Sequence, residues 1–205
     1  SHISQVSALG ALAAWRITQS IYRFDSTLAS ELVRTEFDSA LPVAILLRLP
    51  EWCVYIESPA GVTFLDQSVA GWFVHLESDA NTGRIEFRFL FDFTDNQSWD
   101  RLQPVILHLS HGASLLNAID AACKESANQS ALTRVNLHPA RAANAADILT
   151  AEIKAPLALT LYLCSQEPDI AGSAGSPQQY FRECTKFKKT KKGLRRFPPN
   201  RPAVW

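Results

Sequence analysis

The stretch Leu41–Glu57, LPVAILLRLPEWCVYIE, is the one around which we expect the fold to be organised. Its first half places apolar side chains at every second position: Val43, Ile45, Leu47 and Leu49. This alternation is typical of a half-buried strand. After Pro50, the unbroken apolar run from Trp52 to Ile56 is typical of a strand covered on both faces. The stretch therefore predicts the central strand, or a pair of strands, of a sheet.

The composition is that of an ordinary globular chain, with 205 residues, 47% of them hydrophobic and 20% charged. No apolar run approaches the roughly 18 residues needed to span a bilayer. No signal peptide is apparent either, so we expect a cytoplasmic protein. The sequence contains no Met and ends abruptly at Trp205, from which we expect a chain truncated at both ends.

The net charge of zero hides a strong asymmetry. From Arg182 onward there are nine basic residues and one acidic residue, which leaves 11 basic and 19 acidic residues in the preceding part. We therefore predict an acidic single domain over residues 1–170. A flexible connector and a basic, Pro-containing tail are expected over residues 171–205.

Upstream of the opening stretch, Ile3–Val33 is predicted to be helical, as two helices or one bent helix. The apolar stripe that favours this prediction consists of Ile17, Ile21, Phe24, Leu28 and Leu32. Asp25, Ser26 and Thr27 offer N-cap side chains where a second helix would begin.

Downstream, period-2 patterns predict a series of strands. They lie at Val62–Leu65, Trp72–Glu77, Arg84–Phe93 and Pro104–Leu109, the first forming a hairpin with the preceding strand. In Arg84–Phe93, five apolar side chains face one way and charged ones face the other, which predicts one buried and one solvent-exposed face.

The pattern then changes to a helical period over Leu115–Cys123 and again over Ala145–Ser165. Pro156 is expected to kink or restart the second helix. The predicted fold class is α+β, with N-terminal helices, an antiparallel sheet of about five strands, and C-terminal helices packed on one face.

Signals for catalysis are weak, and no cofactor is predicted. His108 and His111 could supply two metal ligands, but no third ligand lies at a diagnostic spacing. Acidic residues could form a metal-dependent nuclease site, the candidates being Glu77, Asp79, Glu86, Asp92 and Asp95. Cys53, Cys123 and Cys164 lie in apolar contexts and are expected to be buried, with no metal bound.

The basic tail is the strongest physical signal for a partner. Clustered Lys and Arg side chains neutralise phosphates, and interleaved aromatic residues stack on bases. The candidate nucleic-acid-binding residues are Lys186, Lys188, Lys189, Lys191, Lys192, Arg195 and Arg196. RNA is the favoured ligand, with a solubilising segment or an acidic protein surface as alternatives.

Three unusual strings stand in order along the chain. They are Ala14-Trp15-Arg16 with Ile21-Tyr22, then Leu49-Pro50-Glu51-Trp52-Cys53-Val54-Tyr55, and Leu163-Cys164-Ser165-Gln166-Glu167-Pro168-Asp169-Ile170. In order and spacing they resemble the type V-A anti-CRISPR family designated V-A two. We refer to them below as the first, second and third motifs.

This resemblance implies an inhibitor rather than an enzyme. Members of that family lower production of the type V-A CRISPR effector nuclease in the service of phages and plasmids. They are understood to recognise the N-terminal polypeptide of the effector as it is translated, and to cause loss of its messenger RNA. The implied partners are that peptide and, through the basic tail, the ribosome or the message, with no membrane involved.

Binding a nascent peptide requires an apolar groove with polar anchors, or an open sheet edge. The candidate peptide-binding residues are Trp15, Tyr22, Trp52, Tyr55, Trp72, Glu167 and Asp169. For Trp52, Cys53 and Tyr55, core packing is the competing interpretation. The competing functions are a metal-dependent ribonuclease acting on the message and a general RNA-binding module.

Overall fold

The computed structural model describes residues 2–38, 40–78, 83–95, 102–124, 145–165, 170–171 and 181–184, of which 2–7, 145–146, 170–171 and 181–184 are described by their backbone only. A long helix, α1 (His2–Thr18), precedes a short strand, β1 (Ile21–Phe24), and a second helix, α2 (Ser26–Arg34). The chain then enters a 3-10 helix, η1 (Val43–Arg48), and the sheet strand β2 (Cys53–Glu57).

The remaining elements complete one sheet and its helical cover. They are β3 (Thr63–Phe64), β4 (Gln67–Ser78), β5 (Ile85–Phe93), β6 (Gln103–His108), α3 (Leu115–Lys124), α5 (Ala145–Leu163), β7 (Ile170–Ala171) and β8 (Phe181–Cys184). Within the described ranges the sheet has eight strands in the order β6-β5-β4-β2-β1-β8-β7, with β3 paired to β4.

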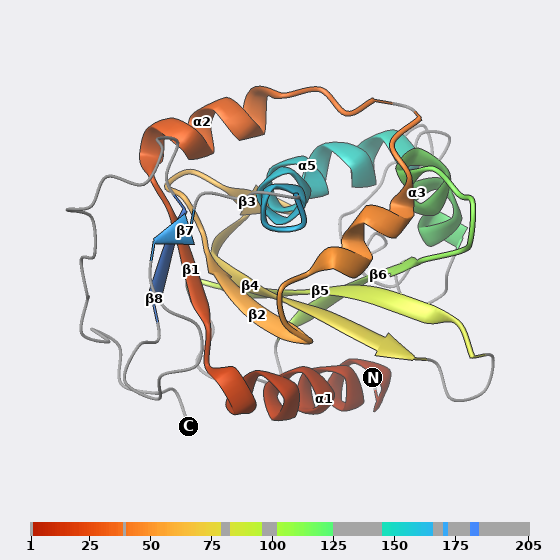
Figure 1. The fold of residues 1–205 in the computed structure, drawn as a ribbon, viewed down its shortest axis with the longest axis horizontal. Coiled ribbons are helices and arrows are strands. Elements are labelled where there is room, and N and C mark those ends of the chain that lie inside the picture. Colours follow the sequence, from red (N-terminus) through yellow and green to blue (C-terminus); the bar gives the residue numbers. More distant parts are fainter. Residues whose placement is uncertain are drawn as a thin grey trace.

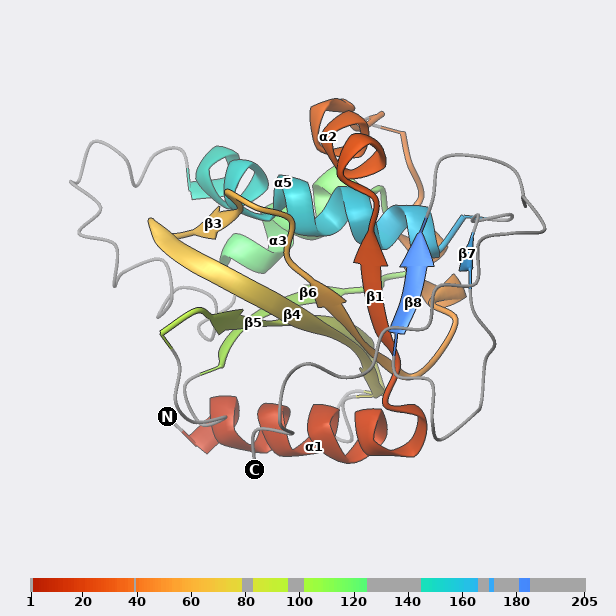
Figure 2. The same cartoon turned by 90° about the vertical axis from the view of Figure 1, so that its left-hand side faces the viewer.

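The sheet separates two layers of helices, as Figures 1 and 2 show. On one side α2, α3 and α5 cover the main hydrophobic core, which includes Trp72, Phe87, Phe89 and Phe91. On the other side α1 covers a smaller cluster around Phe73 and Leu90. The α+β fold class is confirmed, and α1 adds a cover on the face opposite the other helices.

The predicted strand over the first half of Leu41–Glu57 is wrong, because Val43–Arg48 forms the 3-10 helix η1. Its buried residues are Val43 and Leu46, and Leu49 follows them at the same interval of three. A 3-10 helix repeats every three residues, so these side chains share one face. The apparent alternation also included Leu47, which is 45% exposed. The second half is a strand as predicted.

The predicted helix over Ile3–Val33 is interrupted by a strand that was not expected. Four residues, Ile21–Phe24, form β1, with Tyr22 and Phe24 buried in the main core. A run this short fits helical and strand periods equally well. The capping prediction is confirmed, because the Asp25 side chain accepts from the backbone amides of Thr27 and Leu28.

The strands predicted downstream are present, and β2, β4, β5 and β6 pair in antiparallel order. Two details differ. The short strand β3 pairs with β4 rather than with the preceding strand, across a two-residue turn at Leu65 and Asp66 that have positive φ angles of 53° and 62°. The second face of β5 is only partly exposed, because α1 covers that side, where Leu90 packs with Ala8 and Ala11, and Glu86 is buried as well.

The two downstream helices also match their predictions. The Ser114 hydroxyl oxygen accepts from the Asn117 amide at the start of α3. The helix α5 continues through Pro156, and Figure 1 shows its later half turned end-on relative to its earlier half, as a Pro kink would produce. The sheet itself extends past residue 170 through β7 and β8. Among the described residues, no helix is long and apolar enough to cross a membrane.

Candidate functional site

The first and second motifs meet at Ser20, which is buried in the turn between α1 and β1. The Ser20 carbonyl oxygen accepts hydrogen bonds from the Trp15 indole and from the backbone amide of Tyr55, both at 3.0 Å. The Ser20 hydroxyl donates to Oε1 of Glu51, also at 3.0 Å. Ser20, which lies within the span of the first motif, therefore joins α1, β1 and the beginning of β2. We call Trp15, Ser20, Glu51 and Tyr55 the motif junction.

The chain reaches this junction through a sharp reversal at the end of α1. Gln19 has a positive φ of 52°, and its amide donates to the Trp15 carbonyl at 2.6 Å. A residue in this left-handed conformation commonly ends a helix by capping its last carbonyls. The reversal places Ser20 and the strand β1 directly beside the indole of Trp15.

A row of aromatic rings extends from the junction along the face covered by α1. Trp15 meets Phe73 edge-on, with ring centroids 5.7 Å apart, and Phe73 meets Tyr55 at 4.8 Å. The Tyr55 hydroxyl donates to Oδ2 of Asp92 at 3.2 Å. Trp15 and Tyr55 are half-buried, and both pack against the small cluster.

Gly71 makes room for the Tyr55 ring. A Cβ atom at position 71 would lie 2.3 Å from the Tyr55 ring and 2.6 Å from the Ile56 carbonyl oxygen. The β4–β5 register shifts between Val69 and Gly71, which marks a local irregularity of the sheet. Glycine at this bulge therefore fixes the position of Tyr55, a residue of the second motif.

The remaining predicted aromatic residues fall into two groups. Trp52 is 71% exposed, and its backbone carbonyl accepts from the Leu76 amide at 3.0 Å. Tyr22 and Trp72 are fully buried in the main core and offer no surface to a peptide in this structure. Of the five predicted aromatic residues, Trp15, Tyr55 and Trp52 are therefore the accessible ones.

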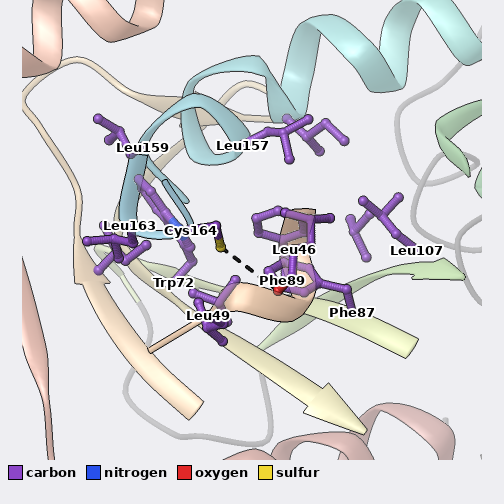
Figure 3. Close-up of a cluster of buried hydrophobic side chains, with 14 of the residues drawn as sticks. Leu46, Leu49, Trp72, Phe87, Phe89, Leu107, Leu157, Leu159, Leu163 and Cys164 are labelled. Carbon is purple, nitrogen blue, oxygen red and sulfur yellow. Dashed lines mark hydrogen bonds between the residues drawn. The ribbon is translucent and has the colours of Figure 1, made fainter. Parts of the chain in front are cut away.

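The beginning of the third motif also packs onto the opening stretch. The Cys164 thiol lies 3.9 Å from the Leu46 carbonyl oxygen, and Leu163 is buried in the same core, as Figure 3 shows. The first and third motifs thus both contact Leu41–Glu57, the stretch that contains the second motif. The predicted anchors Glu167 and Asp169 lie outside the described residues. The candidate nucleic-acid-binding residues of the tail, from Lys186 to Arg196, lie outside them too.

A cluster of charged residues lies near α1 on the same face. Arg88 forms ion pairs with Glu77, at 2.6 Å, and with Glu86. His75 lies 3.7 Å from Glu77. The helix α1 is close to this cluster, since a Cβ atom added at Gly10 would lie 3.7 Å from the His75 ring. Burial, with a contribution from the positive charge of Arg88, lowers the pKa of His75 to about 4. His75 is therefore neutral at pH 7.

The acidic residues do not form the cluster that the nuclease alternative requires. Glu77 and Glu86 are opposite each other in the β4–β5 ladder, whereas Asp92 is opposite Gly71 near the other end. Asp92 lies six positions along β5 from Glu86, a distance of about 20 Å. Within the described part of the chain, no group of three His, Cys, Asp or Glu residues is placed to hold a metal ion. Asp79 lies outside the described residues.

The three cysteines predicted to be buried are buried thiols. Cys53, Cys123 and Cys164 are unpaired and buried. Burial raises the pKa of Cys164 to about 12 and that of Cys53 further still, the latter with a contribution from the charge of Glu51. A thiol with such a pKa remains protonated at neutral pH and is a poor nucleophile.

Several residues of the junction and of the aromatic row beside it were not expected from the sequence. Ser20 carried no signal of its own, because hydrogen bonding to its backbone carbonyl leaves no sequence pattern. Phe73 carried no signal beyond its place in a predicted strand. Glu51 and Gly71 offered partial signals: Glu51 lies within the second motif, and Gly71 is an isolated glycine in a strand pattern.

Comparison with known proteins supports the family resemblance. The family model described as AcrVA2-like, the anti-CRISPR type V subtype A2 family, matches residues 22–205. No curated protein matches the chain. A solved structure entitled "Crystal structure of AcrVA2" is similar at a TM-score of 0.61 and 22% sequence identity. The similarity covers 89% of this chain but 62% of that one, so this chain spans less than two thirds of its length. The resemblance is confirmed, and the chain belongs to the type V subtype A2 anti-CRISPR family.

Proposed function

We propose that this protein lowers production of the type V-A CRISPR effector nuclease by recognising the N-terminal polypeptide of the effector as it is translated. Recognition leads to loss of the effector messenger RNA. On this proposal the protein acts by binding, in the cytoplasm of the bacterial host, and a nuclease other than this chain removes the message.

The observation that carries the proposal is the exposure of Trp52. Cys53 and Val54, the next two residues of the second motif, are buried, and packing explains their presence. Packing does not explain Trp52, which is 71% exposed. Exposed Trp side chains are enriched at the binding centres of protein interfaces, because they bury a large area at little entropic cost. Trp52 therefore supports peptide contact at the start of β2.

Charge supports the same proposal. The chain before Arg182 carries 11 basic and 19 acidic residues, so it attracts a peptide that begins with an amino group and carries basic side chains. Glu51, which precedes Trp52 in the sequence, adds a carboxylate at the motif junction, where it accepts a hydrogen bond from Ser20. The basic run Lys186–Arg196 supplies the contact with messenger or ribosomal RNA.

A binding titration tests the proposal. The full chain is titrated with a peptide of the first few tens of residues of the effector and with a scrambled peptide, at two salt concentrations. Saturable binding that depends on sequence and changes little with salt is the expected result. Equal binding of both peptides that disappears with salt would contradict peptide recognition and favour a general RNA-binding module.

A further inference from the structure

The sheet edge beside the first motif is occupied by a segment from far along the chain. In the strand order, β1 separates β2 from β8, and among the described strands the two-residue β7 alone lies beyond β8. The strands β1 and β8 run parallel over four residue pairs, from Ile21 with Phe181 to Phe24 with Cys184. Figure 2 shows β8 lying alongside β1. Without β8, the backbone of β1 would be an open edge.

The contacts that hold β8 in the sheet are few. Its partner β1 has four residues, and on its other side β7 contributes two residue pairs, Ile170 with Cys184 and Ala171 with Glu183. By contrast, the β4–β5 ladder extends from Val69 to Ser78. Short strand pairs contribute little stability on their own. Replacement of β8 by another extended segment therefore costs little free energy.

The same edge is adjacent to the motif junction. Ile21 and Tyr22 of the first motif are the residues that pair with Phe181 and Arg182. They directly follow Ser20, which binds Trp15, Glu51 and Tyr55. On the other side of β1, Ile21 pairs with Tyr55 of the second motif. An extended peptide beside β1 would thus lie against the residues that define the family resemblance.

We propose that β8 occupies the peptide-binding edge of β1 and that the incoming peptide displaces it by adding to the sheet as a strand. This inference rests on the proposed function and specifies its site. Main-chain hydrogen bonds supply affinity in such strand addition, and side-chain pockets supply specificity. In the sequence, the basic run begins two residues after β8, at Lys186.

A reversible lock tests the exchange. Arg23 and Glu183 are Cα partners in the β1–β8 pair, and neighbouring strands lie about 4.8 Å apart, which suits a disulfide. The variant carries Arg23→Cys and Glu183→Cys, with Cys184→Ser to prevent mispairing. Oxidation should lower the affinity for the effector peptide by about tenfold or more, because the competent state becomes rare, and reduction should restore it.

Three controls separate the possible results. Arg23→Cys alone and Glu183→Cys alone, each with Cys184→Ser, must be insensitive to oxidation. The first of these also accounts for loss of the Arg23–Glu57 ion pair, which has a distance of 2.7 Å. The double variant Arg182→Pro with Glu183→Pro weakens β8 pairing, since proline lacks the amide donor, and should raise peptide affinity.

The outcomes distinguish failure of strand exchange from failure of peptide recognition. Equal peptide affinity in the oxidised and reduced lock would overturn strand exchange and leave peptide recognition standing. Absence of peptide binding in every form, including the double proline variant, would overturn the proposed function and this inference together.

Discussion

The two faces of the sheet differ in chemistry. On the face covered by α2, α3 and α5, the core is apolar, with Phe64 stacked on Phe91 at a centroid distance of 4.1 Å and Phe89 stacked on Phe91 at 6.1 Å. On the face covered by α1 lie the Arg88 ion-pair cluster and the half-buried rings of Trp15 and Tyr55. The first face holds the larger apolar core. The second packs a smaller apolar cluster and also holds polar and half-buried groups.

The largest effect on stability is expected on the apolar face. Phe89 is fully buried among aromatic neighbours, so Phe89→Ala should lower the free energy of unfolding by about 3–5 kcal/mol. Urea unfolding followed by circular dichroism measures this change. A loss below about 1 kcal/mol would show that this face is loosely packed and would remove the contrast between the two faces.

The next largest effect concerns Gly71. Gly71→Ala places a methyl group 2.3 Å from the Tyr55 ring, so we expect a loss of about 3 kcal/mol of unfolding free energy. Gly10→Ala adds the same methyl group in α1, where its nearest contact would be 3.7 Å. That control should be neutral or stabilising by up to about 1 kcal/mol, because Ala favours the helix. Equal effects at both sites would contradict the close fit of Tyr55.

A smaller effect is expected from pH at the charged cluster. The pKa of His75 is about 4 in the folded protein, compared with 6.5 for an ordinary His. Between these values the unfolded chain binds a proton that the folded chain does not, so the unfolding free energy falls as pH falls from 6.5 towards 4. The loss attributable to His75 is at most about 3 kcal/mol.

The measurement is the pH dependence of urea unfolding in the wild type and in His75→Gln. The variant should show a shallower decline below pH 6.5. His111→Gln is the matched control, since His111 lies in an exposed turn and should leave the pH dependence unchanged. A decline of equal slope in wild type and His75→Gln would assign the effect to groups other than His75.

Much of the fold could be predicted from the sequence, because long segments repeat one period many times. The alternation over Arg84–Phe93 and the cap at Asp25 each determine local structure without tertiary context. Short segments could not be assigned in this way. The four residues Ile21–Phe24 fit a helical period and a strand period equally well. In η1, Val43, Ile45 and Leu47 also match the alternation of a strand. The parallel placement of β8 depends on contacts across the whole chain.

The site was predictable in part for a similar reason. The motifs located Trp15, Trp52 and Tyr55, but periodicity could not distinguish the exposed Trp52 from the buried Trp72. Both are large aromatic residues beside or within a strand. Trp72 lies in the main core and Trp52 does not, and this difference requires the folded structure.

The central claim, that recognition depends on residues that stability does not require, is tested most directly by Trp52→Ala. Peptide affinity and unfolding free energy are measured on the same variant, with Trp52→Phe as the conservative control. The account predicts at least about a tenfold loss of affinity for the effector peptide, partial rescue by Phe, and a change in unfolding free energy below about 0.5 kcal/mol. Unchanged peptide affinity in Trp52→Ala, with the fold intact, would contradict the account.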